Sequence, residues 1–139
     1  MANWIGTSRT NYVLCTDRTG LVNSLEGFAI DVRFNDDDQV MFMDEGSDDG
    51  NWPFYRTTEE GEEEDFDWAL HVMPFIAEGE VLVVAQAGAE KRRYVTGWSE
   101  AYVRKGKEVS SVAVSINDIY QKASHEFGIP AERISVAEY

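Results

Sequence analysis

The sequence has little of several features that define common protein classes. Cys15 is the only cysteine among 139 residues, so no disulfide can form within the chain and a reducing, cytoplasmic compartment is expected. No apolar run approaches the roughly 18 residues that a membrane-spanning helix needs. Residues 1–5 lack the basic and apolar pattern of a signal peptide. The sequence therefore predicts neither a membrane protein nor a secreted, disulfide-stabilised one.

Basic residues are also scarce. The chain has 12 Lys and Arg against 26 Asp and Glu, which gives a formal net charge of −14. Direct binding to nucleic acid draws its affinity from Lys and Arg that neutralise phosphates, and anionic membranes attract proteins in the same way. This balance argues against both kinds of partner.

Catalytic and metal-binding motifs are missing too. The two histidines, His71 and His125, lie far apart and are expected to be partly exposed on helices, so no His-rich zinc site is predicted. The chain has no P-loop, no G-x-G-x-x-G and no G-x-S-x-G. When Gly50 is set at position 6 of an EF-hand loop, Arg56 replaces the closing glutamate. We therefore expect no enzyme, no cofactor and no metal, with weak calcium binding at 36–49 or a hydrolase of unrecognised geometry as alternatives.

What the sequence does have is enough apolar residues for one domain, and one very acidic segment. Hydrophobic residues make up 43% and aromatics 12%, which supports a single folded domain over residues 1–139. Residues 36–67 hold 14 acids and one base, a net charge of −13, whereas the flanking segments are close to neutral. Such a segment is either a solvated loop that keeps the protein soluble or a surface for a basic partner.

The apolar periodicity predicts an α+β fold with a mostly antiparallel sheet and two longer helices. The order is strand, helix, two strands, the acidic loop, helix, three strands and helix. The strands are expected at residues 11–16, 28–34, 39–43, 80–86, 92–104 and 112–116. The helices are expected at residues 17–25, 62–73 and 118–127, the second beginning with acids that suit a helix N-terminus.

Three stretches resemble small uncharacterised proteins carried by bacterial plasmids, phages and gene cassettes. They are NWIGTSRTNYV at the start, Gly-Asn-Trp-Pro at 50–53, and GEVLVVAQAGAEKRRYVTGWSEA at 79–101. Some acidic proteins of such mobile elements, including antirestriction and anti-CRISPR inhibitors, mimic the phosphate array of DNA. The resemblance implies a partner with a basic groove, and it assigns no role to individual residues.

We therefore expect a non-enzymatic binding protein that attracts a basic nuclease or DNA-binding protein by charge mimicry. Its contact surface would combine seven acids with three aromatic anchors: Asp36, Asp37, Asp38, Asp44, Glu45, Asp48, Asp49, Trp52, Phe54 and Tyr55. The alternative is a small ligand-binding or structural domain, as a homo-oligomer, with its site near Trp98 and Tyr102. These two side chains share one face of the strand at 92–104 with Tyr94.

Overall fold

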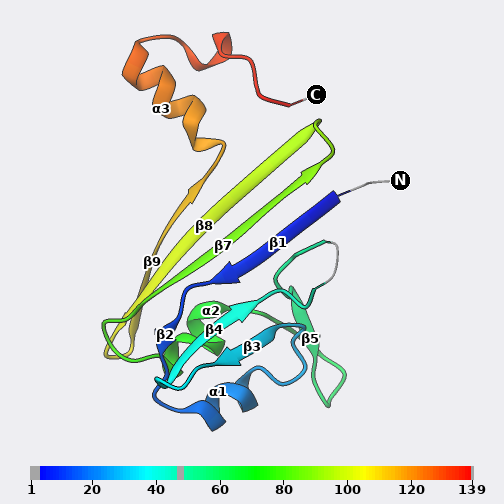
Figure 1. The fold of residues 1–139 in the computed structure, drawn as a ribbon, viewed down its shortest axis with the longest axis vertical. Coiled ribbons are helices and arrows are strands. Elements are labelled where there is room, and N and C mark those ends of the chain that lie inside the picture. Colours follow the sequence, from blue (N-terminus) through cyan, green and yellow to red (C-terminus); the bar gives the residue numbers. More distant parts are fainter. Residues whose placement is uncertain (1–3, 47–48, 139) are drawn as a thin grey trace.

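The computed structural model describes residues 4–46 and 49–138, and it is an α+β structure built on a seven-stranded antiparallel sheet (Figure 1). β4 lies between β3 on one side and β1 with β2 on the other, and the sheet continues from β1 to β7, β8 and β9. The bounds of these strands are β1 Trp4–Thr10, β2 Val13–Leu14, β3 Asp31–Phe34, β4 Gln39–Met43, β7 Val81–Glu90, β8 Tyr94–Lys105 and β9 Glu108–Ser115.

The remaining elements are short. β5 and β6 form a separate two-stranded hairpin. Its bounds, with those of the helices and 3-10 turns, are β5 Tyr55–Thr57, β6 Glu63–Asp65, α1 Arg18–Ser24, α2 Trp68–His71, η1 Met73–Phe75, α3 Asp118–Phe127 and η2 Ala131–Arg133.

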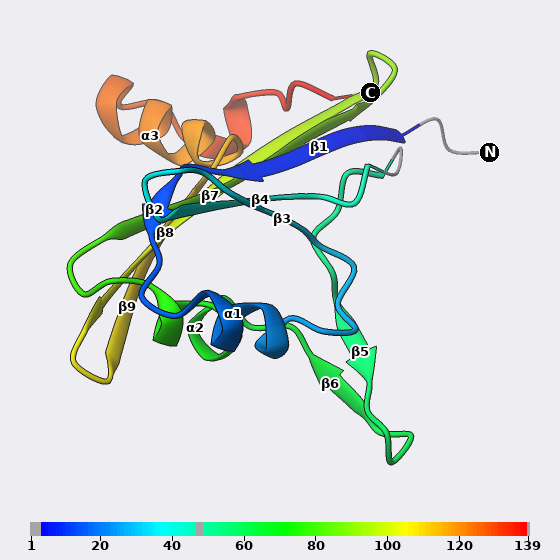
Figure 2. The same cartoon turned by 60° about the horizontal axis from the view of Figure 1, so that its bottom comes forward.

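The core lies between one face of the sheet, here called the inner face, and the layer of α1, α2 and η1 (Figure 2). Successive strand residues point to opposite faces, so alternate residues of each strand are buried. On β7, Leu82 and Val84 are fully buried, whereas Val81 and Val83 are exposed on the opposite, outer face. Each fully buried side chain of this kind contributes about 1.5–3 kcal/mol relative to exposure.

Several sequence predictions are confirmed. The hairpin appears as β3 and β4, joined by the turn that holds Asp36–Asp38. The first helix begins where predicted, because an oxygen of the Asp17 carboxylate accepts a hydrogen bond from Gly20 N at 2.9 Å. The strands at 80–86 and 92–104 appear as β7 and β8.

The strand predicted at residues 11–16 is confirmed only as the short β2, Val13–Leu14, and the longer strand before it was not predicted. The chain forms β1 from Trp4 to Thr10, pairs along its whole length with β7, and then shifts to β4 through the short β2. Asn11 lies where the chain leaves β7. Its side-chain amide donates to Val81 O at 3.0 Å and accepts from Val83 N at 2.8 Å. These bonds give the backbone groups of β7 hydrogen-bond partners at the point where β1 ends.

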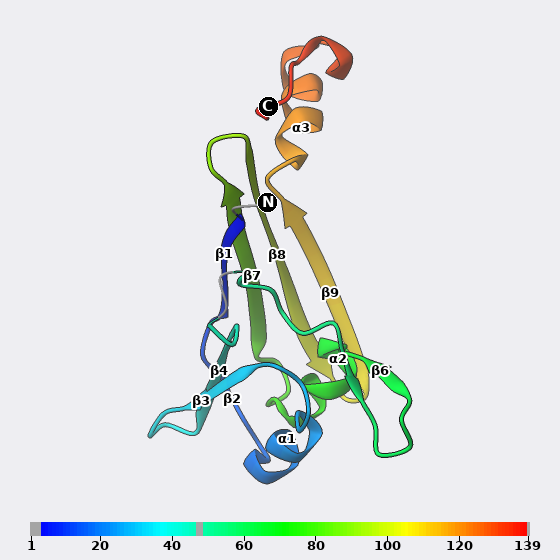
Figure 3. The same cartoon turned by 90° about the vertical axis from the view of Figure 1, so that its right-hand side faces the viewer.

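The prediction of two longer helices is not confirmed. A helix starting at Glu62 is wrong, because residues 63–65 pair as β6 with β5. Helix α2 starts at Trp68, where Asp67 Oδ1 accepts from Ala69 N at 2.9 Å, and it has four residues. α3 has ten residues but lies beyond the end of the sheet and does not cover it (Figures 1 and 3).

Candidate functional site

Two hollows lie on either side of the segment 51–54, and together we call them the acidic cleft. The larger, of about 550 Å³, separates this segment from the inner face of the sheet. It is lined by Asn51, Trp52, Pro53, Phe54, Asp65, Phe66, Asp67, Trp68, Gln86, Trp98, Glu100 and Tyr102. The smaller, of about 260 Å³, is lined by Ala29, Glu45, Asp49, Asn51, Trp52, Pro53, Phe54 and Tyr55.

The segment is held in place by close contact of its start with β1. Gly50 has a φ of +61° and lies so near Gly6 that a Cβ on either residue would overlap backbone atoms of the facing loop or strand. The Ser8 hydroxyl donates to Gly50 O, and Gln86 Nε2 donates to Asn51 Oδ1 at 2.8 Å. These contacts fix the Asn51 side of the cleft to the sheet, so the cleft is built into the fold.

The floor of the larger hollow comes from alternate residues of β7 and β8. The strand register pairs Gln86 with Trp98, and Glu100 and Tyr102 follow on the same face of β8. The Tyr102 hydroxyl donates to Glu100 Oε2 at 2.7 Å. Burial, and then this neighbouring carboxylate, raise the pKa of Tyr102 well above its ordinary value, so the hydroxyl stays protonated and keeps donating.

Aromatic rings form much of the wall. Trp52 and Trp68 meet edge to face with centroids 4.9 Å apart, and Phe66 contacts Trp68 at the same distance. Trp52 is 6% exposed, and its indole Nε1 is buried without a hydrogen-bond partner among the described residues. A buried indole N–H normally finds a partner, so this group marks an unsatisfied donor in the wall of the cleft.

The charges in the lining are all negative. Asp65, Asp67 and Glu100 lie around the larger hollow, and Glu45 and Asp49 lie around the smaller. None of the described residues that line either hollow is Lys, Arg or His. Carboxylates beside aromatic faces form an environment that favours a cation, because the face of an aromatic ring is negative.

The structure brings together half of the acids and anchors predicted from the sequence. Glu45, Asp49, Trp52, Phe54 and Tyr55 all line the smaller hollow. Their exposure differs, since Phe54 is 74% and Tyr55 51% exposed whereas Trp52 belongs to the core. Trp52 therefore forms the wall, and the other two aromatics are available on the surface.

The remaining predicted acids lie elsewhere. Asp36, Asp37 and Asp38 are in the β3–β4 turn, at the opposite end of β4 from Asp44. The Asp44 carboxylate is used within the loop, where it accepts from Ser8 N and Gly46 N, each at 2.8 Å. Asp48 lies outside the described residues.

The alternative pair, Trp98 and Tyr102, lies on the floor of the larger hollow and shares it with Trp52 and Phe54. The sequence treated these as two separate sites. The structure places them in one continuous cleft, because the loop at 49–54 folds onto the inner face beside β8.

The exposure of His71 differs strongly from the sequence prediction. The residue was expected to be partly exposed, but it is 3% exposed. Its Nε2 lies 2.6 Å from Glu64 Oε2, its Nδ1 accepts from Asp67 N at 3.0 Å, and its ring contacts both Phe28 and Phe66. Both ring nitrogens are engaged, so the imidazole ties β6 to α2.

Arg56 completes this network. Its guanidinium pairs with Glu64 at 3.1 Å, donates to Ser24 O and Glu26 O, and lies over the Phe28 ring. His71, and then Arg56, lower the pKa of Glu64 below its ordinary value. The network is formed by residues of α1, β5, β6 and α2, and it holds the acidic hairpin against the core.

Neither a metal site nor a reactive cysteine is indicated in the described part of the chain. No cluster of three or more His, Cys, Asp or Glu there could hold a metal ion. Burial raises the pKa of the Cys15 thiol, which is the opposite of what a reactive cysteine needs. Within residues 4–46 and 49–138, no helix has the length and apolar character to cross a membrane.

Comparisons with protein-family models, with curated proteins and with solved structures found no match for this chain. The geometry of the acidic cleft and the charge around it are therefore the features that point to a function.

Proposed function

We propose that the protein is a non-enzymatic acidic binding protein that captures a basic protein, with the acidic cleft receiving cationic side chains of the partner. The observation that carries this proposal is the lining of the cleft, where five carboxylates and several aromatic rings occur with no basic residue among the described lining. A guanidinium suits such a site better than an ammonium, because it stacks on rings and forms paired hydrogen bonds to carboxylates.

Further acids lie away from the cleft and add to the negative charge of the molecule. Asp36–Asp38 lie at one end of β4, and the tip of the β5–β6 hairpin carries Glu59, Glu60 and Glu62 at another corner of the molecule (Figure 2). Distributed negative charge raises the association rate with a basic surface. A basic nuclease or DNA-binding protein has the required charge, and the resemblance to proteins of mobile elements agrees with such a target and with inhibition by charge mimicry.

The test is binding of a fluorescent octa-arginine peptide, followed by anisotropy at low and high salt. The cleft variant Glu45→Gln/Asp49→Asn/Asp65→Asn/Glu100→Gln is expected to weaken binding by about tenfold or more. The matched control, Glu59→Gln/Glu60→Gln/Glu62→Gln/Glu63→Gln, removes the same charge from the hairpin and is expected to weaken it several-fold less. Equal losses would mean that diffuse charge attracts the peptide and would reject the cleft as the site.

A small-molecule function is favoured by one observation. The larger hollow has about 550 Å³, a volume within the range of small-ligand sites, and its floor holds Trp98 and Tyr102. A free organic cation would then bind without a protein attached. Calorimetry with arginine amide and tetramethylammonium distinguishes the two functions, because a small-ligand site would bind one of them about as tightly as octa-arginine.

A further inference from the structure

The outer face of the sheet is apolar and exposed. Val81, Val83, Val95, Val112 and Val114 are between 37% and 70% exposed. The register of β7, β8 and β9 places them on the same side, with Ala101 between Val83 and Val112 and with Ser99 opposite Val114. Monomeric proteins rarely expose a continuous apolar surface of this kind.

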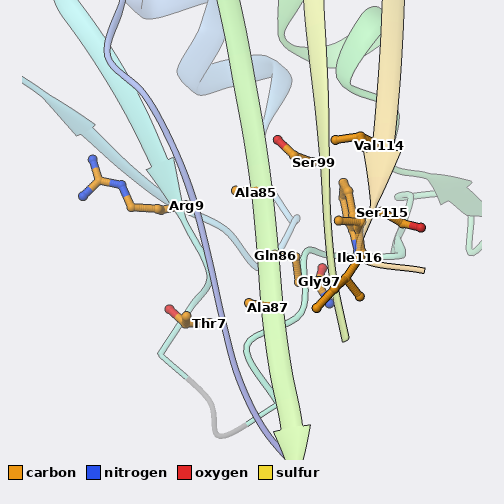
Figure 4. A pocket seen from close by; sticks show the side chains of 11 residues that line it. Thr7, Arg9, Ala85, Gln86, Ala87, Gly97, Ser99, Val114, Ser115 and Ile116 are labelled. Atoms are coloured by element: carbon orange, nitrogen blue, oxygen red, sulfur yellow. The ribbon is translucent and has the colours of Figure 1, made fainter. Parts of the chain in front are cut away.

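This face is also hollowed. One shallow hollow of about 490 Å³ crosses β1, β7, β8 and β9, and Thr7, Ala85, Ala87 and Val114 are among the side chains around it (Figure 4). A second, of about 300 Å³, lies nearer the β8–β9 turn and includes Val81, Val103 and Val112. Larger side chains from another element could fill both hollows.

The chain carries an element with a matching surface in α3. Ile119, Ala123 and Phe127 follow one another at intervals of four residues and so share one side of the helix. Ile119 is 56% and Phe127 70% exposed, and no residue of the described helix is buried. α3 therefore has an apolar side that is uncovered in the single chain.

The connection to β9 keeps α3 away from its own sheet. β9 ends at Ser115 and α3 begins at Asp118. The joint is fixed, because Ser115 N donates to Asp118 Oδ2 at 2.7 Å and Ile116 N donates to Gly97 O at 2.8 Å. The helix consequently continues past the end of the sheet, as Figures 1 and 3 show.

Charge indicates what covers the outer face. At the outer-face positions of the described strands β1, β7, β8 and β9, the charged residues are Arg9, which lines the larger hollow, and the facing pair Lys105 and Glu108. A basic partner would find no acidic surface there. Two copies of a chain with a net charge of −14 would repel each other least through this face, because it carries no excess of acids.

We propose that two copies of the chain pair through their outer faces, with α3 of each copy lying on the sheet of the other. Four strands over eight residues give about 500 Å² and a ten-residue helix about 150 Å² per copy. The total for two copies, about 1,300 Å², falls in the range of specific interfaces. Either element alone falls short of that range, so the exchange of α3 is part of the proposal.

The first test is the mass of the full chain in solution, measured by light scattering over a range of concentrations. The expected mass is twice the 15.7 kDa of one chain. Val114→Asp on the sheet and Phe127→Asp on α3 should each raise the dissociation constant about tenfold or more, because each buries a charge in an apolar contact. The control Leu70→Asp changes an equally exposed apolar residue on α2 and should leave the mass unchanged.

Three results would overturn this proposal. They are a wild-type chain that is monomeric at every concentration, a dimer that tolerates both charged variants, and a dimer that Leu70→Asp disrupts equally. Circular dichroism of each variant verifies that it is folded, and Phe127→Asp lies outside the sheet and the core. The octa-arginine titration reports separately on the acidic cleft, so failure of the dimer and failure of the proposed function are distinguishable.

The second test asks which sheet α3 contacts. In a Cys15→Ser background, Val112→Cys and Phe127→Cys are joined with a short bis-maleimide. The exchange predicts a covalent dimer on a denaturing gel. A link within one chain would place α3 on its own sheet, and an absence of links would place it on neither; both results contradict the exchange.

Discussion

The two faces of the sheet are built from alternate residues of the same strands, yet they differ in almost every property. On the inner face, β7 contributes Leu82 and Val84 to a closed core and Gln86 to the acidic cleft. On the outer face, the neighbouring Val81 and Val83 stay exposed beside small, uncharged residues. The acidic cleft lies on the inner side, and the outer face of β1, β7, β8 and β9 has no excess of acids.

This difference would allow one small chain to carry both of the contact surfaces proposed above. A surface that attracts cations over a distance needs charge, and charge opposes the pairing of like copies. Since side chains alternate along a strand, the sheet can present a charged surface on one face and an apolar surface on the other. Each prediction below tests one part of this difference between the two faces.

The largest effect is expected from the core side of β7. Leu82→Ala removes a side chain that is fully buried and should lower the free energy of unfolding by about 2–5 kcal/mol. Val83→Ala, on the next residue, should cost less than about 1 kcal/mol because its side chain is 37% exposed. Urea unfolding at a protein concentration too low for pairing measures both, and similar losses would contradict the assignment of the two faces.

The next effect is expected at Arg56, which joins the acidic hairpin to the inner side. Arg56→Ala leaves Ser24 O, Glu26 O and the Glu64 carboxylate without their donor, and should cost about 1–3 kcal/mol. Arg56→Lys should recover little of it, because an ammonium cannot reproduce the planar fork. Hydrogen exchange should increase mainly in β5 and β6, and an increase spread evenly over the sheet would refute this local role.

A smaller effect concerns the independence of the two faces. Val114→Asp should weaken pairing about tenfold and leave octa-arginine binding within about twofold of wild type. The cleft variant should do the reverse. Coupling of the two readouts, with each variant lowering both, would show that the faces do not act separately.

Much of the sheet could be predicted because its residues follow local rules. The hairpin of β3 and β4 and the shared face of Trp98 and Tyr102 follow from alternation along a strand. β1 was missed because the sequence Trp4–Thr10 contains glycine and small polar residues and becomes a strand through pairing with β7. The acids at 62–65 suggested a helix N-terminus, but the register sets Glu64 opposite Arg56, and this cross-strand pairing makes a strand instead.

The acidic cleft was predictable in parts but not as a whole. The sequence supplied Trp52 and Phe54 from one hypothesis, and Trp98 and Tyr102 from another. Their meeting depends on the close approach of Gly50 to Gly6, a contact between residues far apart in the chain. The burial of His71 also depends on contacts that the local sequence does not show, since its partner Glu64 belongs to the β5–β6 hairpin.

The smallest effect is expected at Glu64, and it depends on pH. His71 and Arg56 lower the pKa of Glu64 in the folded protein below its ordinary value of 4.5. A carboxylate of this kind stabilises the fold above its unfolded-state pKa, and the contribution disappears as the pH falls through the lower, folded-state pKa. Glu64→Gln should therefore be less stable than wild type at neutral pH, and the difference should shrink as the pH falls below about 4.5. Urea unfolding across this range measures it, with Glu108→Gln on the outer face as a control for the loss of one charge. Parallel pH profiles for wild type and Glu64→Gln would show that the ion pair is not what fixes the hairpin to the inner side, and would leave that role to Arg56 and its backbone contacts.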